Sequence, residues 1–474
     1  MARASGRGHR ATFAVLLAGV ATFALLQSFA TPVLPTIQRS LHTSQSTVTW
    51  VLTAYLLSAS ICTPILGRVG DIAGKERVFV ATLLTLAAGS LLAALASSVG
   101  VLIAARVVQG VGGGVLPLTF GIIRDEFPEH LVSGAIGVAA ALAAVGAGVG
   151  IVLAGPIVTG LNYHWLFWIP LIITVVTAVA AHLVVPESPI RTPGRINWRS
   201  ALALSGWLLA LLVALSKGDS WGWTSAKVLG LLGVAAVLLA VWLLVELTAH
   251  EPLVDMRMLA IPTVWRTNLV SLLAGVGMYS MYAFVPDFVQ TPSSAGYGFG
   301  ATQTASGIFV LPLTLTMFVF GILSGSLSRR FGTKTVLVIG TAVSVAPCAL
   351  LAFAHDAEWQ ISLALGSSGI ALGLVFATMS NLVVDAVPYE QTGVASGMNA
   401  NIRTVGGAIG AAMMTSVVGA GVASNAIPKE SGYTHGFLAL GVAACLATVA
   451  ALAVPAHHRR FRASAPRVAA LAEP

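Results

Sequence analysis

Charged residues are scarce in this sequence, and their scarcity excludes a soluble globular domain. They make up 9% of the 474 residues, while hydrophobic residues make up 57%. Soluble domains, by contrast, are about a quarter charged. Apolar runs recur along the whole chain, and each is long enough to cross a bilayer core of about 30 Å. The composition therefore predicts an all-α polytopic membrane protein with the lipid bilayer as its surroundings.

Cysteine and clustered histidine are also lacking. Cys62, Cys348 and Cys445 lie far apart inside apolar runs, so their spacing indicates neither a disulfide nor a metal site. Histidines are adjacent only at His457 and His458. Because the sequence offers no nucleophile–base pair, an enzyme is the least supported class, and we expect no catalytic residue, cofactor or metal.

The basic residues indicate membrane topology rather than nucleic-acid binding, although the net charge is +8. We expect spans near residues 12–34, 49–66, 78–98, 101–121, 132–158, 165–185, 200–216, 227–247, 264–288, 302–325, 335–354, 361–384, 392–418 and 434–455. With a cytoplasmic N-terminus, 19 of the 25 Lys and Arg residues fall inside and 4 outside, while Arg106 and Arg403 lie within spans. This positive-inside bias predicts a multi-pass protein of the cell membrane, with fourteen spans and both termini cytoplasmic.

A faint internal repeat divides the chain. Residues 325–334 follow the tenth span much as 67–75 follow the second, with Gly325 matching Gly67 and Gly332 matching Gly74. Repeated halves with a substrate site between them are typical of secondary transporters. We expect a six plus two plus six architecture, made of a cytoplasmic tail, a six-helix bundle, a linker with two extra spans, a second six-helix bundle and a basic cytoplasmic tail: 1–11, 12–185, 186–263, 264–455 and 456–474.

The hairpin at 67–77 holds five charges in eleven residues. Its glycines allow close backbone approach and a tight turn, while its aspartate can accept hydrogen bonds from a helix N-terminus or pair with a cation. A charged topogenic loop is the alternative. The run resembles the cytoplasmic loop 2–3 signature of the major facilitator superfamily. That resemblance implies a conformational latch formed by Gly67, Gly70, Asp71, Gly74, Lys75 and Arg77.

The fourth span carries Arg106, Gln109, Gly110 and Gly113 on one helix face. An arginine within a span is costly and normally faces the bundle interior or a wet cavity. A structural arginine satisfied by backbone carbonyls is the alternative. The run resembles the superfamily's span 4 signature, which implies that Arg106 takes part in proton coupling.

The fifth span has a face of small residues, which allows close helix packing. Its Gly146, Gly150, Gly155 and Pro156 resemble the antiporter signature of drug-exporting members. The sequence departs from that signature at Thr159, where a second glycine is usual. The resemblance implies export rather than import.

Other runs are similar to the fourteen-span drug:proton antiporters, so the resemblance covers nearly the whole chain. They are 34–41, 252–255 with the preceding Glu246, and 403–410. One departure concerns coupling, because Leu26 stands where the span 1 signature usually carries an aspartate. No acidic residue lies near the middle of a span. Asp287, near the outer end of the ninth, is our candidate for proton coupling, and an interfacial carboxylate without a role is the alternative.

Weaker polar and aromatic groups are then expected to line a substrate cavity: Gln27, Thr31, Tyr55, Gln109, Asn268, Tyr279, Tyr282, Asn399 and Arg403. Aromatic side chains offer large apolar contact that suits varied drugs, although packing is their commoner role.

The sequence thus predicts a secondary active transporter that exports small, mostly hydrophobic or amphipathic compounds, such as drugs or antibiotics, by alternating access in exchange for protons. The expected partners are a small-molecule substrate, protons and lipid, with no nucleic acid, and the expected state is a monomer. The alternatives are a dedicated exporter of one metabolite with different coupling, and a membrane receptor or scaffold that does not transport.

Overall fold

The computed structural model describes residues 6–30, 33–48, 50–188, 196–420 and 427–455. All regular structure in these residues is helical. The α-helices are α1 (Gly6–Phe29), α2 (Leu34–Ser40), α3 (Gln45–Val48), α4 (Trp50–Ala73), α5 (Lys75–Ala94), α6 (Val99–Gly110), α7 (Val115–Glu126), α8 (Glu129–Gly160), α9 (Trp165–Val184), α10 (Trp198–Trp221), α11 (Ala226–Thr248), α12 (Met256–Leu259), α13 (Pro262–Gln290), α14 (Gln303–Phe331), α15 (Thr333–Val343), α16 (Val345–Phe353), α17 (Glu358–Ala386), α18 (Thr392–Gly419) and α19 (Glu430–Ala453).

Fourteen helical segments in the described residues are long and apolar enough to cross a membrane, which confirms the predicted number of spans. Helices suit the apolar runs because a chain in lipid must satisfy its backbone hydrogen bonds internally. The fourth span is divided into α6 and α7 by a 3₁₀ turn at Val111–Gly114. Its three consecutive glycines have no side chains to resist that tighter winding.

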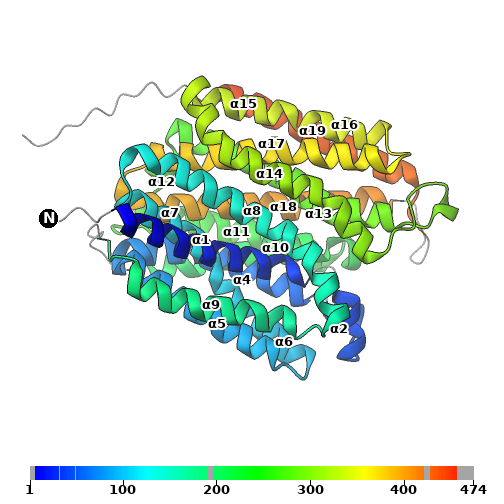
Figure 1. Ribbon diagram of the computed structural model, residues 1–474, viewed down its shortest axis with the longest axis horizontal. Helices are drawn as coiled ribbons and strands as arrows, with labels where there is room; N and C mark the ends of the chain where they lie inside the picture. The colour runs from blue at the N-terminus through cyan, green and yellow to red at the C-terminus, as the bar shows by residue number, and fades with distance from the viewer. Residues whose placement is uncertain (1–5, 31–32, 49, 189–195, 421–426, 456–474) are drawn as a thin grey trace, which may run out of the picture.

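The long helices run side by side and pack in two groups (Figure 1). In one, α1 contacts α8 and α9, and α5 contacts α6 and α9. In the other, α13 contacts α18 and α19, and α17 contacts α14 and α15. The groups meet where α8 packs on α14 and α17, and where α4 and α7 pack on α18. Their interface runs through the centre of the molecule.

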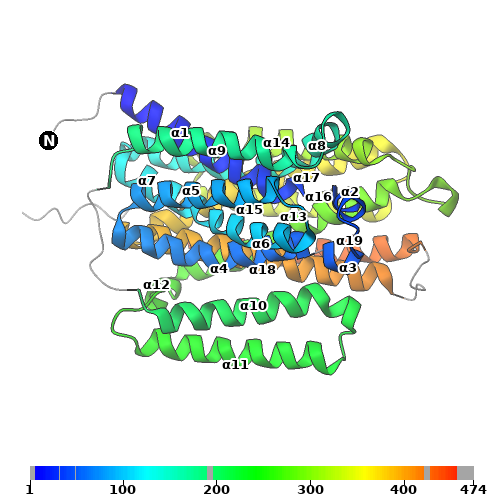
Figure 2. The ribbon, with the colours of Figure 1, turned by 90° about the horizontal axis from the view of Figure 1, so that it is seen from below.

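The helices α10 and α11 form a separate hairpin along one side (Figure 2). Only 17% of the most apolar stretch of α11 is buried against protein, so this helix is suited to face lipid. By contrast, α10 packs against both α4 and α18, one from each group. The hairpin therefore lies over the seam between the two groups, with α10 inside and α11 outside.

Both halves of the predicted repeat turn at a glycine with positive φ. Gly74, between α4 and α5, has φ +109°, and Gly332, between α14 and α15, has φ +85°. Glycine adopts such values at little cost, whereas other residues are strained there. The two sequence-matched glycines thus make the same kind of turn.

Candidate functional site

Glycines let the last turns of α4 approach the start of α18. A Cβ added to Gly67 would stand 2.6 Å from the carbonyl oxygen of Gly393, closer than real Cβ atoms come to backbone. A Cβ on Gly70 would strike the side chain of Leu118 in α7. Bare backbone at Gly67 therefore lets α4 of one helix group close on α18 of the other at this end, which we call the Asp71 end, while Gly70 brings α4 close to α7 within one group.

A buried ion-pair network holds the turn that follows α4. Lys75 Nζ lies 2.5 Å from Asp125 Oδ2 and 3.7 Å from Asp71 Oδ1, and all three side chains are at most 1% exposed. Ser188 donates a hydrogen bond to the same oxygen of Asp125. Asp71 also abuts the first turn of α18, since a Cβ on Gly393 would stand 3.0 Å from its Oδ1. A helix N-terminus favours a carboxylate, so the network ties α4, α5 and α7 to α18.

The turn itself leaves no room for a side chain. A Cβ on Gly74 would meet the carboxylate of Glu187. That carboxylate forms an ion pair with the exposed side chain of Arg77, with Nε 3.1 Å from Oε2. The six residues of the expected latch thus lie together at one end, and their action as a latch stays a prediction.

Arg124 of α7 joins the two helix groups at the same end. Its guanidinium donates to Thr392 Oγ1 at 2.5 Å and to the carbonyl oxygens of Val387 at 2.8 Å and Pro388 at 3.2 Å. Its Cζ also lies 4.1 Å from the ring centroid of Tyr389. One side chain therefore satisfies the end of α17 and the turn that leads into α18.

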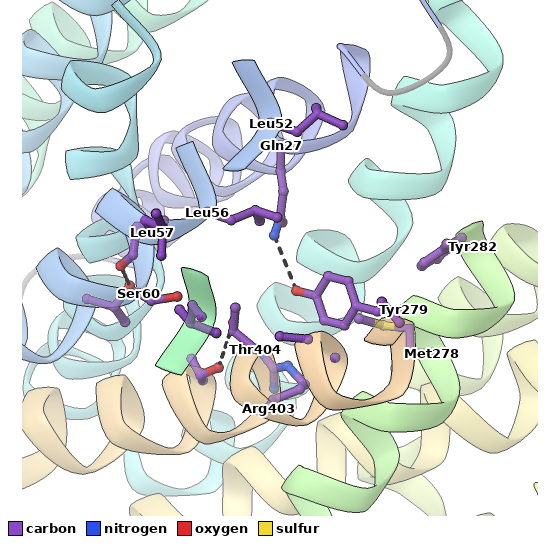
Figure 3. A pocket seen from close by; sticks show the side chains of 18 of the residues that line it. Gln27, Leu52, Leu56, Leu57, Ser60, Met278, Tyr279, Tyr282, Arg403 and Thr404 are labelled. Atoms are coloured by element: carbon purple, nitrogen blue, oxygen red, sulfur yellow. Dashed lines mark hydrogen bonds between the residues drawn. The ribbon is translucent and has the colours of Figure 1, made fainter. Parts of the chain in front are cut away.

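A cavity of about 470 Å³ lies between the two helix groups (Figure 3). This volume is within the range of about 300–1,000 Å³ that is common for small-molecule sites. Along α18 its lining runs from Ser396 to Thr415, and on the opposite side it includes residues of α1, α4, α7 and α8. α10 adds Asp219, and Trp223 follows in the loop. The cavity is thus a long, mostly apolar space that stops short of the contacts at the Asp71 end.

Five residues expected in a cavity line this one: Gln27, Tyr279, Tyr282, Asn399 and Arg403. Gln27 Nε2 donates to the hydroxyl of Tyr279 at 3.2 Å, so α1 and α13 are bridged across the space (Figure 3). Their roles toward a substrate stay predictions.

Three other expected residues do not line the cavity but lie behind its wall. Asn268 is buried and accepts a 2.9 Å hydrogen bond from Asn399 Nδ2, so it orients a lining residue. Tyr55 and Gln109 are 0% exposed and contact Arg106. Thr31 lies outside the described residues.

Arg106 is also 0% exposed and does not line the cavity. Its Nε donates to the carbonyl of Val51 at 3.0 Å, and its Nη1 donates to the carbonyl of Leu26 at 3.1 Å and to Gln109 Oε1 at 2.9 Å. Its Cζ stands 4.1 Å over the ring of Tyr55. This geometry is that of the structural alternative, in which one guanidinium holds α1, α4 and α6 together. A part in proton coupling stays a prediction.

The glycines of the expected antiporter motif bring α8 against α1. A Cβ on Gly146 would stand 2.6 Å from that of Ala24, and a Cβ on Gly150 would strike Ser28. Gly155 and Pro156 lie further along α8, where Pro156 is exposed. The close contact thus involves the first two residues and lies beside Ser28, which lines the cavity.

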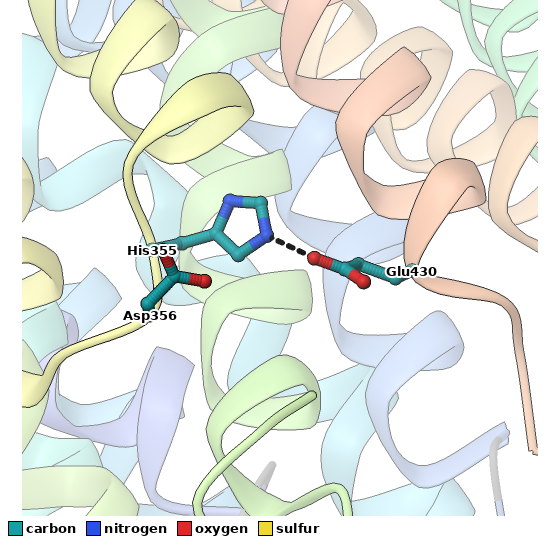
Figure 4. Close-up of side chains that lie close together, drawn as sticks. All are labelled: His355, Asp356 and Glu430. Carbon is teal, nitrogen blue, oxygen red and sulfur yellow. Dashed lines mark hydrogen bonds and ion pairs between the residues drawn. The ribbon is translucent and has the colours of Figure 1, made fainter. Parts of the chain in front are cut away.

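The expected coupling carboxylate Asp287 is exposed near the end of α13 and does not line the cavity. The next residue, Phe288, contacts His355 with ring centroids 5.2 Å apart, and His355 belongs to a second polar cluster that joins the loop before α17 to α19 (Figure 4). His355 Nδ1 lies 2.8 Å from the carbonyl of Leu351, and its Nε2 lies 2.8 Å from Glu430 Oε1. A carboxylate oxygen of Asp356 lies within 4.8 Å of these ligand atoms. Because both ring nitrogens of His355 are used, the cluster acts as a cross-link away from the cavity.

The residues of this site that were not among the expected ones include Asp125, Arg124, Asp219 and Trp223. Asp125 and Arg124 were visible in the sequence as charges that follow an apolar run, but only packing shows that they join α5 and the start of α18. Asp219 and Trp223 belong to the expected linker, whose position against the seam no local pattern reveals.

Comparison with known proteins agrees with this geometry. Residues 16–411 match the family model described as Major Facilitator Superfamily. The chain is 28% identical over 413 residues to the tetracenomycin C resistance and export protein of Streptomyces glaucescens, which covers 85% of this chain and 74% of that protein. It is also 27% identical over 379 residues to the multidrug transporter protein MdtP of Bacillus subtilis. That match covers 79% of this chain and 69% of MdtP. The fold is similar to the human organic anion transporter MFSD10, with a TM-score of 0.69 at 16% identity over 93% of this chain and 99% of that one.

Proposed function

Because the chain belongs to the major facilitator superfamily, we propose that it is a secondary active transporter that exports small, mostly hydrophobic or amphipathic compounds by alternating access. The observation that carries the proposal is the cavity of about 470 Å³ between the helix groups, with the groups in contact at one end of it. The names of relatives that export tetracenomycin C or several drugs support export.

The closing contacts suggest how access would alternate. Gly67 against Gly393, with the hydrogen bonds of Arg124, would seal the Asp71 end while a substrate leaves by the other end. Separation of these contacts would admit the next substrate from the Asp71 end. Rigid-body rocking of two bundles around a central site is the usual form of this cycle.

The orientation follows from the basic residues. We place the Asp71 end in the cytoplasm, together with both termini, because 19 of the 25 Lys and Arg residues then fall inside. The rocking units would be residues 12–185 and 264–455 of a monomer in the cell membrane, with 186–263 following the seam between them.

Exchange for protons is the coupling that we propose, with Arg106 and Asp287 as the charged residues nearest to such a role. A second candidate is a dedicated exporter of one metabolite with different coupling. The observation that favours it is Leu26, whose backbone carbonyl accepts the hydrogen bond of Arg106 at 3.1 Å and which stands where the resembled span 1 signature usually carries an aspartate.

An accumulation assay in a pump-deficient bacterium tests the function. Cells that express the protein should retain less of several unrelated amphipathic dyes than cells that express Arg124→Ala, which loses the contacts across the Asp71 end. Arg329→Ala, an exposed cation on the last turn of α14, serves as the matched control and should behave like the wild type. Equal dye retention with all three proteins would reject export, and reduced retention of one compound alone would favour the dedicated exporter.

A further inference from the structure

Arg403 has a guanidinium without a protein acceptor, although it belongs to the wall of the central cavity. Its Cζ lies 4.9 Å from the ring centroid of Phe376. Within the part of the chain that the structure describes, no hydrogen bond or ion pair reaches this side chain. Figure 3 shows it beside Thr404 and near Tyr279, at the same space that Gln27 enters.

Three buried or half-buried cations of the protein are supplied with acceptors, whereas buried Lys217 contacts the ring of Trp50. Arg106 donates to two carbonyls and an amide oxygen, Arg124 to two carbonyls and a hydroxyl, and Lys75 lies near two carboxylates. An ionised group away from bulk water is costly unless it is paired, and within a membrane protein it normally marks a functional site. Arg403 is therefore a cation whose acceptor has to come from outside the chain.

The other charged residue of the cavity wall does not fill this need. Asp219 lies in the last turn of α10, and Trp223, just beyond it, donates from Nε1 to Ser416 Oγ at 2.8 Å. Ser416 follows Arg403 by thirteen residues of α18, a separation of about 20 Å at the rise of an α-helix. Asp219 thus lies toward the far end of the cavity, where it cannot neutralise Arg403.

We propose that Arg403 forms an anion-binding subsite, and that the preferred substrates are aromatic or polycyclic organic anions. This inference rests on the proposed function, because it takes the cavity to be where the exported compound binds. A guanidinium presents paired N–H donors that match a carboxylate or a similar oxyanion. The aromatic body would lie against Met278, Tyr279 and Tyr282 of α13, which line the same cavity.

Binding to the purified protein, without any ion gradient, tests the subsite separately from transport. Three fluorescent probes share one ring system and differ in charge: 9-anthracenecarboxylate, 9-anthracenemethanol and 9-anthracenemethylammonium. The wild type should bind the carboxylate about 10-fold or more tightly than the ammonium compound. Arg403→Gln should weaken the carboxylate about 10- to 100-fold, the size of a lost charge-assisted hydrogen-bond pair, while affinity for the alcohol changes less than about 2-fold.

Two further variants make the result decisive. Arg403→Lys keeps the positive charge but lacks the paired N–H donors of a guanidinium, so it should retain part of the preference for the carboxylate. Arg329→Gln, which lies outside the cavity, should retain all of it. Wild-type protein that binds the ammonium compound as well as the carboxylate, or does not bind the carboxylate, would overturn the proposal. So would an equal loss of all three probes in Arg403→Gln, because that would be a structural role. Wild-type protein that shows no preference for the carboxylate but still carries out proton-driven dye efflux would reject the subsite and leave the proposed function standing.

Discussion

At the scale of single residues, Arg106 shows how backbone carbonyls can accept the hydrogen bonds of a charged side chain within a membrane span. Its guanidinium is held by the carbonyls of Leu26 and Val51 and by Gln109, whose amide in turn donates to Ser90 Oγ at 3.0 Å. Nε and Nη1 are thus used, while Nη2 has no hydrogen-bond partner among the described residues. Removal of one partner of a buried charge leaves the others orphaned. These contacts join three helices, and a part of Arg106 in proton coupling stays a prediction.

We expect Arg106→Ala to destabilise the protein by about 3–5 kcal/mol, because two carbonyls and the Gln109 amide would lose their donor. Arg106→Lys should also destabilise, since an ammonium group cannot reach acceptors on three helices in the same geometry. Thermal unfolding in detergent measures both, with Val107→Ala, exposed to the lipid side, as the control. An unchanged melting temperature together with lost transport would instead assign Arg106 to coupling alone.

Leu26 offers a direct test of coupling. Leu26 itself supplies the backbone carbonyl that accepts a hydrogen bond from Arg106. A carboxylate introduced by Leu26→Asp would stand in the same helical turn, and its charge would favour an ion pair with Arg106. We expect this variant to move more protons per exported substrate than the wild type, measured as pH change in vesicles with matched substrate flux. Leu26→Asn, similar in shape but not ionisable, should not. Equal proton movement by all three proteins would contradict a coupling role for this position.

At the scale of elements, the hairpins at 67–77 and 325–334 make the same kind of glycine turn but differ in how closely they pack on a neighbouring helix. Gly67 abuts the backbone of Gly393, whereas a Cβ on its repeat partner Gly325 would stand 3.6 Å from Gly134 Cα, an ordinary contact distance. Repeated sequence therefore predicts the repeated turn, yet the tightness of each crossing depends on a partner helix far away in the chain.

This asymmetry predicts opposite outcomes for matched substitutions. Gly67→Ala should hold α4 away from α18 and lower the population closed at the Asp71 end, so that transport falls, while Gly325→Ala should be tolerated. Spin labels on the ends of α4 and α18 report the separation by pulsed dipolar spectroscopy. An unchanged distance distribution in Gly67→Ala, or an equal shift in both variants, would rule out this account of closure.

At the scale of the whole molecule, hydropathy predicted the fourteen spans because lipid leaves few alternatives to a long apolar helix. Side-chain type also placed Gln27, Tyr279 and Arg403 at the cavity. Side-chain type could not distinguish residues that line the cavity from residues that support its wall. Tyr55 and Gln109 face the bundle interior but contact Arg106 behind the cavity wall. Nor could it show that α10 closes the seam between α4 and α18, which is a property of packing alone.

Proton movement in energised inside-out vesicles tests the central claim most directly. With the cytoplasmic side outward and an acid interior, addition of a transported compound should dissipate the pH gradient, because each compound that enters the vesicle exchanges for protons that leave it. Vesicles with Arg124→Ala should keep their gradient, and those with Arg329→Ala should lose it as the wild type does. Measurable uptake of the compound by wild-type vesicles with an undisturbed gradient would contradict proton-coupled export by this protein.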